Sequence, residues 1–321
     1  MTMGIFFAII AGFFWGFIFI IPTFIPEYPG LMQSCGRYMS FGLFSIILSW
    51  KEIKKLKYLK KKDWITATKL SFVGNILYYA CLSGAIQKIG APISTIVIGI
   101  LPLTISLYSI WHSKNTKKNN NFEIISYESL FLSILCIVFG LILINLHEIR
   151  SFSSYSSKIS FFEYFYGFLL ANIALFCWTW YPIKNLHWLK KNSKIESSTW
   201  TTAQGIVTFP LSLLVYFLVC INIYVNKKNF PLPFGPNPYL FIFLMLTLGI
   251  FCSFLGLLFW NKASKIIPSS KMGSMIIFEV IFGIIYAFLL KKKFPSILFS
   301  LGIIFILLGV FITSKIKKNK L

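Results

Sequence analysis

The sequence carries little charge, and very little of that charge is negative. Nine of its 321 residues are Asp or Glu, and charged residues make up 12% of the chain, against about 25% in an average soluble protein. So few charged side chains cannot cover a surface in water. We therefore expect the outer face of the protein to contact lipid.

Several enzyme signatures are also missing. The chain has no Walker A motif, no HExxH, no GxSxG and no paired carboxylates within an apolar segment. These absences argue against a P-loop ATPase, a zinc protease and a serine hydrolase. Because His112, His147 and His187 fall at segment ends or in loops, we expect no buried catalytic dyad and predict that the protein is not an enzyme.

The cysteines suggest neither a disulfide framework nor a metal site. None of the six stands in CxxC spacing, and each falls within an apolar segment: Cys35, Cys81, Cys136, Cys177, Cys220 and Cys252. The sequence therefore predicts no metal and no cofactor.

Long apolar runs dominate what is present. Hydrophobic residues make up 57% of the chain and its mean hydropathy is +0.76. A helix needs about 20 mainly apolar residues to cross a bilayer. The sequence predicts an all-α membrane protein of about ten spans, at residues 3–22, 31–50, 66–86, 90–111, 129–146, 161–183, 199–222, 239–260, 266–290 and 294–314.

The basic residues predict the orientation of these spans. With the N-terminus in the cytoplasm, the inner loops and C-terminal tail carry 21 Lys and Arg and the outer loops carry eight. This positive-inside bias favours a bacterial inner-membrane protein with both termini cytoplasmic, although Lys291–Lys293 falls on the outer side. The net charge of +22 would then serve topology and contact with lipid headgroups, and we expect no nucleic-acid partner.

Internal similarity predicts two halves, residues 1–150 and 151–321. The spacing of Ala91, Pro102 and Lys114 equals that of Pro268, Glu279 and Lys291, and a Trp-x-aromatic pattern occurs at Trp15 and again at Trp178. Because each half holds five spans, the second would be inverted in the membrane. Inverted repeats with a site between them are typical of transporters.

Glu279 is the most informative candidate for function. It falls near the middle of the predicted span 266–290, where a carboxylate is costly unless it is paired or faces water. It could bind a proton or cation that drives transport, or it could be a protonated or lysine-paired structural residue.

The other candidates would line a substrate cavity. Arg37, one of two arginines, could hold a substrate carboxylate, pair with Glu279, or extend to the outer interface. Aromatic walls and polar groups would come from the remaining candidates, for which core packing and hydrogen bonds between helices are the alternatives: Trp15, Asn75, Tyr79, Trp178 and Gln204.

With ten spans, two inverted halves and the recurring Trp-x-aromatic pattern, the chain resembles the EamA-type drug/metabolite transporters. The resemblance implies a central cavity formed by spans 1 to 4 and 6 to 9, with spans 5 and 10 at the periphery. Family members often carry Glu-Pro in each half, whereas here the first half has Leu101-Pro102 and the second Glu279-Val280. This departure puts a symmetric two-carboxylate mechanism in doubt.

These observations predict a secondary active transporter of small metabolites, such as amino acids or related polar or amphipathic compounds. It would work by alternating access, with a proton as a candidate coupling ion. The alternatives are a facilitative exchanger of nucleotide-like or cofactor metabolites, an intramembrane transferase, and a channel or scaffold. The expected partners are the small-molecule substrate and the lipid bilayer, and the sequence does not set the oligomeric state.

Overall fold

The computed structural model describes residues 2–101, 104–105, 131–140, 142–143, 160–226, 229–267, 272–291 and 297–315. Among these residues every regular element is helical, which confirms the all-α prediction. Four helical stretches are long and apolar enough to cross a membrane, and they correspond to the predicted spans 1, 6, 7 and 8: Thr2–Phe24, Phe161–Lys191, Ser197–Asn226 and Pro238–Ile266.

The first span begins as α1 (Thr2–Gly16) and continues as two short 3₁₀ helices, η1 (Phe17–Phe19) and η2 (Ile21–Phe24). Pro22 lies in the first turn of η2, where its missing N–H costs no helical hydrogen bond. The second span is α2 (Gly30–Leu56), which starts after Pro29 and carries Lys54 and Lys55 in its last turn. Lysines at this end complement the negative pole of the helix dipole.

The third predicted span contains a wide turn. It comprises α3 (Lys61–Ser71), the π-helix η3 (Phe72–Leu77) and the start of α4 (Tyr78–Gly99). The helix continues through residues 87–89, where the sequence predicts a connection between two spans. Together the three elements hold 11, 6 and 22 residues, or about 58 Å of helix at 1.5 Å per residue. That is roughly twice the hydrocarbon thickness, although this stretch is not among the four described helices that are long and apolar enough to cross.

The second half shows a matching interruption. After α7 (Phe161–Lys191) and α8 (Ser197–Asn226), the chain forms α9 (Pro238–Thr247), the π-helix η4 (Leu248–Leu255) and α10 (Gly256–Ile266). In both predicted halves, the third span therefore contains a π-helix near its middle.

The predicted span 266–290 differs from one continuous helix. A 3₁₀ segment, η5 (Gly273–Ile276), precedes α12 (Ile277–Lys291), so Glu279 lies in the first turn of a helix rather than in its middle. The last span is α13 (Ile297–Lys315). The end of the predicted span 90–111 and both ends of the predicted span 129–146 fall outside the described residues.

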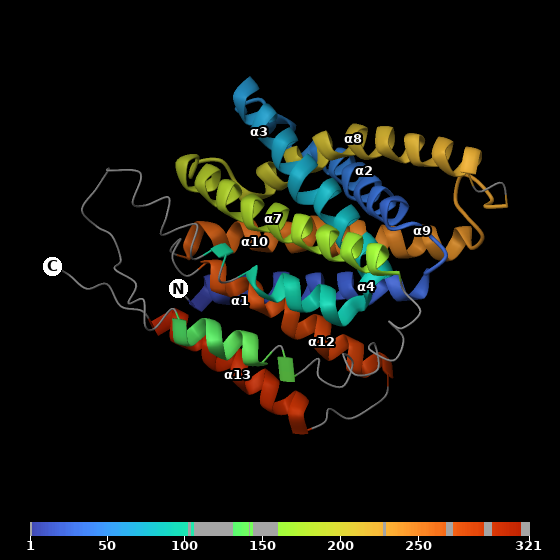
Figure 1. The fold of residues 1–321 in the computed structure, drawn as a ribbon. Coiled ribbons are helices and arrows are strands. Elements are labelled where there is room, and N and C mark those ends of the chain that lie inside the picture. Colours follow the sequence, from blue (N-terminus) through green and yellow to red (C-terminus); the bar gives the residue numbers. More distant parts are fainter. Residues whose placement is uncertain are drawn as a thin grey trace.

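The arrangement of the helices in Figure 1 follows from a few large interfaces between them. The most extensive described interface joins α2 to α8, while α1 packs on α10 and α12, and α7 packs on α4. Residues 131–140 lie against α13 at the lower edge, where Ser133 donates a hydrogen bond of 2.7 Å to the carbonyl of Gly309. The predicted spans 5 and 10 thus lie away from the α2–α8 pair.

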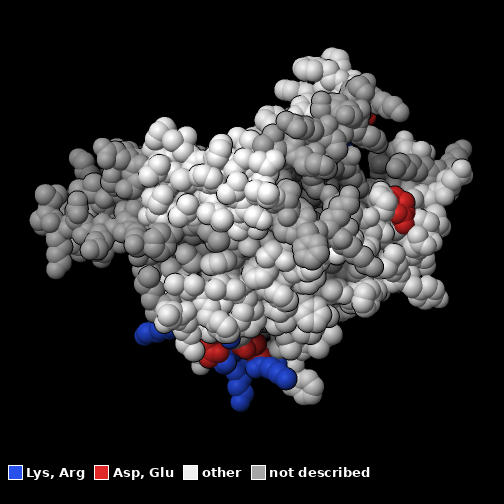
Figure 2. Space-filling view, turned by 90° about the horizontal axis from the view of Figure 1, so that it is seen from below, with Lys and Arg blue, Asp and Glu red and all other residues white. Residues whose placement is uncertain are grey.

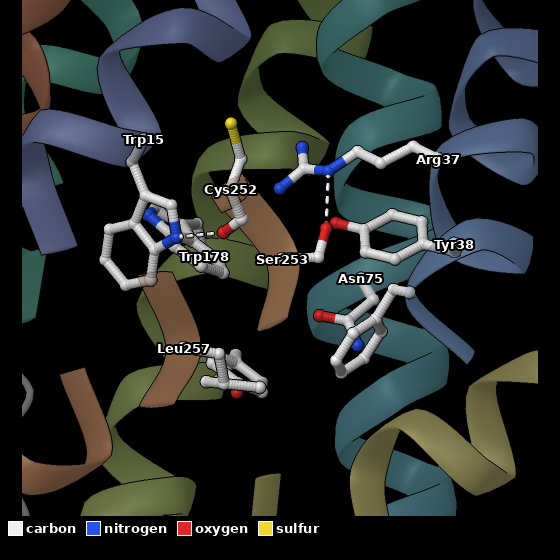
Figure 3. Close-up of a pocket in the computed structure, with 10 residues that line it drawn as sticks. Trp15, Arg37, Tyr38, Asn75, Trp178, Cys252, Ser253 and Leu257 are labelled. Atoms are coloured by element: carbon white, nitrogen blue, oxygen red, sulfur yellow. Dashed lines mark hydrogen bonds between the residues drawn. The ribbon is translucent and has the colours of Figure 1, made fainter. Parts of the chain in front are cut away.

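The exposed surface is strongly apolar. The outward side of α8 alone exposes Leu213, Leu214, Phe217, Leu218, Ile221 and Tyr224. On the face shown in Figure 2, most of the described charged side chains gather at the lower edge, and the described residues drawn above them are mostly uncharged. Such a surface fits burial in lipid.

Charged side chains join the ends of α2 and α8. The Lys55 Nζ lies 2.7 Å from a carboxylate oxygen of Glu196, and this hydrogen bond holds the pKa of Glu196 below its usual value. Thr199 donates a hydrogen bond of 2.7 Å to Glu52. These contacts connect the two predicted halves at this end of the protein.

Candidate substrate site

A small cavity lies among the helices that the sequence predicted to form the site. Its volume is about 20 Å³, and four predicted residues line it together with six others: Trp15, Arg37, Tyr38, Phe41, Asn75, Trp178, Tyr181, Cys252, Ser253 and Leu257. This space holds about one water molecule. The cavity is therefore too small for a ligand much larger than water.

Trp15 and Trp178 form one wall of the cavity. Their rings meet edge to face with centroids 5.4 Å apart, so the two matching positions of the sequence repeat are brought into contact. Trp178 is also stacked between Tyr78 and Tyr181, at 4.5 and 5.3 Å.

A backbone carbonyl fixes the ring of Trp15. Its indole N–H donates a 2.8 Å hydrogen bond to the carbonyl of Cys252, which lies within η4. In a π-helix the i→i+5 pattern displaces carbonyls from their usual α-helical partners. The interrupted helix can therefore offer this acceptor to a side chain.

Arg37 is a buried cation without a counter-ion at contact distance. It is 3% exposed, and its Nε donates a 2.8 Å hydrogen bond to the Ser253 hydroxyl. Its guanidinium lies over the rings of Tyr38 and Tyr79, 4.9 and 4.6 Å from their centroids. The Nη1 atom has no hydrogen-bond partner, and within the described residues no carboxylate lies within ion-pair distance. Arg37 thus points inward and does not extend to the outer interface.

Glu279 is buried beside this group. It is 1% exposed. The Trp178 indole approaches the carboxylate as a hydrogen-bond donor, and Arg37 lies within electrostatic range. No described lysine or arginine forms an ion pair with it. Its place in the first turn of α12 puts it at the positive end of a helix dipole.

Asn75 lines the cavity, whereas Gln204 lies behind a residue that lines it. Asn75 lines the cavity and donates a long hydrogen bond of 3.5 Å to Thr208. Gln204 does not line the cavity; its carbonyl oxygen accepts a 2.9 Å hydrogen bond from the Tyr181 hydroxyl. It therefore acts in this conformation by holding a residue that lines the cavity.

A buried polar network surrounds Gln204 and joins α7, α8 and α10. The Asn185 side-chain oxygen accepts from Trp200 and Gln204 at 2.8 and 3.2 Å, and its amide donates to Asn261 at 2.7 Å. Asn261 in turn donates to Thr201 at 2.9 Å. All these side chains are fully buried, so the network fixes the three helices on one side of the cavity.

Replacing Asn185 with Ala is expected to lower the free energy of unfolding by about 2 kcal/mol or more, because buried partners lose their hydrogen bonds. In detergent this corresponds to a melting temperature lower by about 4 °C or more. Asn172→Ala on the same helix is the matched control, since Asn172 is exposed and bonds only within its helix. Equal melting temperatures for the two variants would contradict this assignment.

Sequence reasoning missed several residues of the site. Tyr38 and Ser253 flank Arg37, and Asn185 and Asn261 bond to each other. Asn185 and Asn261 fall just beyond the predicted spans 161–183 and 239–260, and Ser253 falls within the second of these spans. One sequence feature could have identified the two asparagines. Each is an uncharged amide that lies one or two residues after the end of a predicted span.

Comparisons with known proteins agree with this architecture. The sequence profile of the EamA-like transporter family matches residues 2–146. The inner membrane protein YtfF of Escherichia coli (strain K12) is 36% identical over 321 residues, covering 100% of this chain and 97% of that protein. One solved crystal structure shares the fold with a TM-score of 0.68 at 12% identity, covering 97% of this chain and 96% of its own. The chain therefore belongs to the EamA-like transporter family.

Proposed function

We propose that the protein is a secondary active transporter that moves a small metabolite across the inner membrane by alternating access. The observation that carries this proposal is the cavity lined by the buried cation Arg37. The buried carboxylate of Glu279 lies within electrostatic range of it, and the two form no ion pair. Ionisable groups inside a membrane protein are costly, and they mark substrate and ion pathways.

The contacts between helices support two inverted five-helix repeats. The first helix of each predicted half packs on the third span of the other: α1 contacts η4 and α10, and α7 contacts η3 and α4. The two π-helices occupy matching places in their halves. A pseudo-two-fold axis between the halves would produce this exchange of partners, and it would place the cavity at their interface.

Closure of the cavity fits one state of an alternating cycle. The Asn185 network closes one side, while on the other Tyr28 stacks on Phe241 at 4.6 Å and accepts a hydrogen bond of 2.9 Å at its carbonyl from Gln87. Both termini would be cytoplasmic, as the distribution of lysine favours.

The substrate would be a small polar or amphipathic compound, amino acids included. Trp15, Trp178 and Asn75 line the cavity, so they would contact it directly, and Arg37 would bind an anionic group. Tyr79 and Gln204 would position Arg37 and Tyr181. Glu279 would bind the coupling proton or cation.

Flux into proteoliposomes tests the proposal. Purified protein would be reconstituted and screened against a panel of amino acids, organic acids and nucleosides, with and without a pH gradient. We expect at least one compound to enter well above the rate in protein-free liposomes, and faster with the gradient. Movement that ignores the gradient would identify a facilitator or exchanger, and no movement of any compound would count against transport.

A further inference from the structure

Polar atoms with incomplete hydrogen bonding are concentrated beside the cavity. In the described part of the chain, nine buried side-chain nitrogen or oxygen atoms have no hydrogen bond of good geometry. Six of them belong to one cluster, hereafter the polar cluster, made of Arg37, Tyr78, Tyr79, Trp178 and Glu279. Within the cluster the Trp178 indole approaches Glu279 and the Tyr79 hydroxyl approaches Arg37. Since buried polar groups are nearly always paired in native proteins, this concentration indicates a binding site whose ligand supplies the missing partners.

The polar cluster holds one cationic donor and one carboxylate. Arg37 and Trp178 can only donate, the hydroxyls of Tyr78 and Tyr79 can donate or accept, and an ionised Glu279 can only accept. The Nη1 atom of Arg37 lacks an acceptor, which a ligand carboxylate would supply. The cluster therefore matches a ligand that carries a carboxylate, and the charge of Glu279 decides whether that ligand is a monoanion or a zwitterion.

The charges restrict what can bind. Arg37 and Glu279 are the charged members of the cluster, and each lacks a partner at contact distance among the residues described. While the site is empty, an ionised Glu279 would compensate the charge of Arg37, which lies within electrostatic range. An anion that binds Arg37 adds a second negative charge to a region of low dielectric constant, where like charges repel strongly. Protonation of Glu279 removes this repulsion and turns the carboxyl group into another donor.

We propose that the site takes a small carboxylate-bearing monoanion at Arg37 together with one proton at Glu279, so that the two are carried as an electroneutral pair. This inference rests on the proposed transport function and names its substrate class and stoichiometry. The proton comes from the aqueous side to which the site is open, and it leaves to the other side with the anion.

Among the described residues, no other group near Glu279 takes the place of this proton site. The titratable groups that face it are Arg37 and Tyr38 from α2, Tyr78 from α4 and Cys252 from η4. The helix α1, which packs on α12, carries no titratable side chain. Phenol, thiol and guanidinium groups ordinarily keep their protons at neutral pH, whereas a carboxyl group can be ionised and can gain a proton.

Isothermal titration calorimetry on the full-length protein in detergent tests this inference. The probes are propionate, lactate and benzoate, each with its primary amide, and alanine as the zwitterion. Titrations at pH 6, 7 and 8, in two buffers of different ionisation enthalpy, count the protons taken up. We expect a carboxylate to bind and its amide not to bind. At pH values where free Glu279 is ionised, one proton should be taken up per anion and the affinity should fall by up to about tenfold per pH unit.

Variants separate the two roles. Arg37→Gln should lose carboxylate binding and Arg37→Lys should weaken it, with melting temperatures of the empty proteins showing that both fold. Glu279→Gln should bind the anion at all three pH values without proton uptake. Glu163→Gln, which removes an exposed carboxylate paired with Lys88, should behave as wild type.

Equal binding of amides, tighter binding of alanine with proton release, or no binding of any carboxylate would each overturn the inference. If a neutral or cationic compound crosses proteoliposomes, the transport function stands and this inference fails. If carboxylates bind but no compound crosses, transport fails while the binding site stands.

Discussion

Replacing Glu279 with Gln is expected to leave substrate flux measurable while abolishing its response to a pH gradient. The amide keeps the size of the side chain and can still hydrogen bond, but it cannot take up or release a proton. Flux in wild-type and variant proteoliposomes would be compared at equal pH and with a gradient of one to two pH units. Wild type should accelerate several-fold with the gradient, and the variant should show the same rate under both conditions.

A control variant and a contradicting outcome show whether the loss of the pH response is specific to Glu279. Glu163→Gln removes a carboxylate that is largely exposed, so it should retain the full response. If Glu279→Gln also retains the response, Glu279 is a structural residue that is protonated in the folded protein, and coupling must be sought elsewhere.

Replacing Gly42 with Ala is expected to destabilise the protein strongly, because it separates α2 from α8 at their crossing. A Cβ atom at Gly42 would lie 2.5 Å from the Cβ of Phe209 and 2.7 Å from its Cα. Backbone at this distance cannot rotate away as a flexible side chain can, so the helices must move apart. Overpacking of this kind costs about 3 kcal/mol, or a melting temperature lower by about 6 °C or more in detergent.

Gly84→Ala is the matched control on α4. The nearest atom to a Cβ there is the Cδ1 of Leu170, at 3.1 Å, which is the end of a flexible side chain. Its melting temperature should stay within about 2 °C of wild type. If both variants lose the same stability, the α2–α8 crossing is not the tight interface that the structure indicates.

Hydrophobicity was sufficient to predict most of the helices, because a span must satisfy its backbone internally and be apolar along its whole length. The Trp15 and Trp178 pair was found from the recurrence of one pattern, and the structure places the two rings in contact. Arg37 and Glu279 stood out because ionised side chains are rare in spans, and both are buried beside the cavity.

Other features depend on tertiary structure and could not be predicted. Nothing in residues 72–77 or 248–255 distinguishes a π-helix from an α-helix, since the wide turn is selected by what packs against it. A hydrophobicity pattern likewise cannot distinguish the 3₁₀ segment η5, which precedes Glu279, from an α-helix. Gln204 was a reasonable cavity residue by depth alone, but its direction around the helix axis is fixed by Tyr181 and Asn185.

The two π-helices make these spans sensitive to length. A turn closed by i→i+5 bonds holds more residues than an α-helical turn, so deleting one residue lets η4 relax to an ordinary helix. Residues on one side of the deletion would then rotate by about 100° relative to the other, which would carry the Cys252 carbonyl away from Trp15. Over evolutionary time, residues 72–77 and 248–255 can therefore exchange side chains but cannot easily change their number, whereas loops tolerate insertions and deletions.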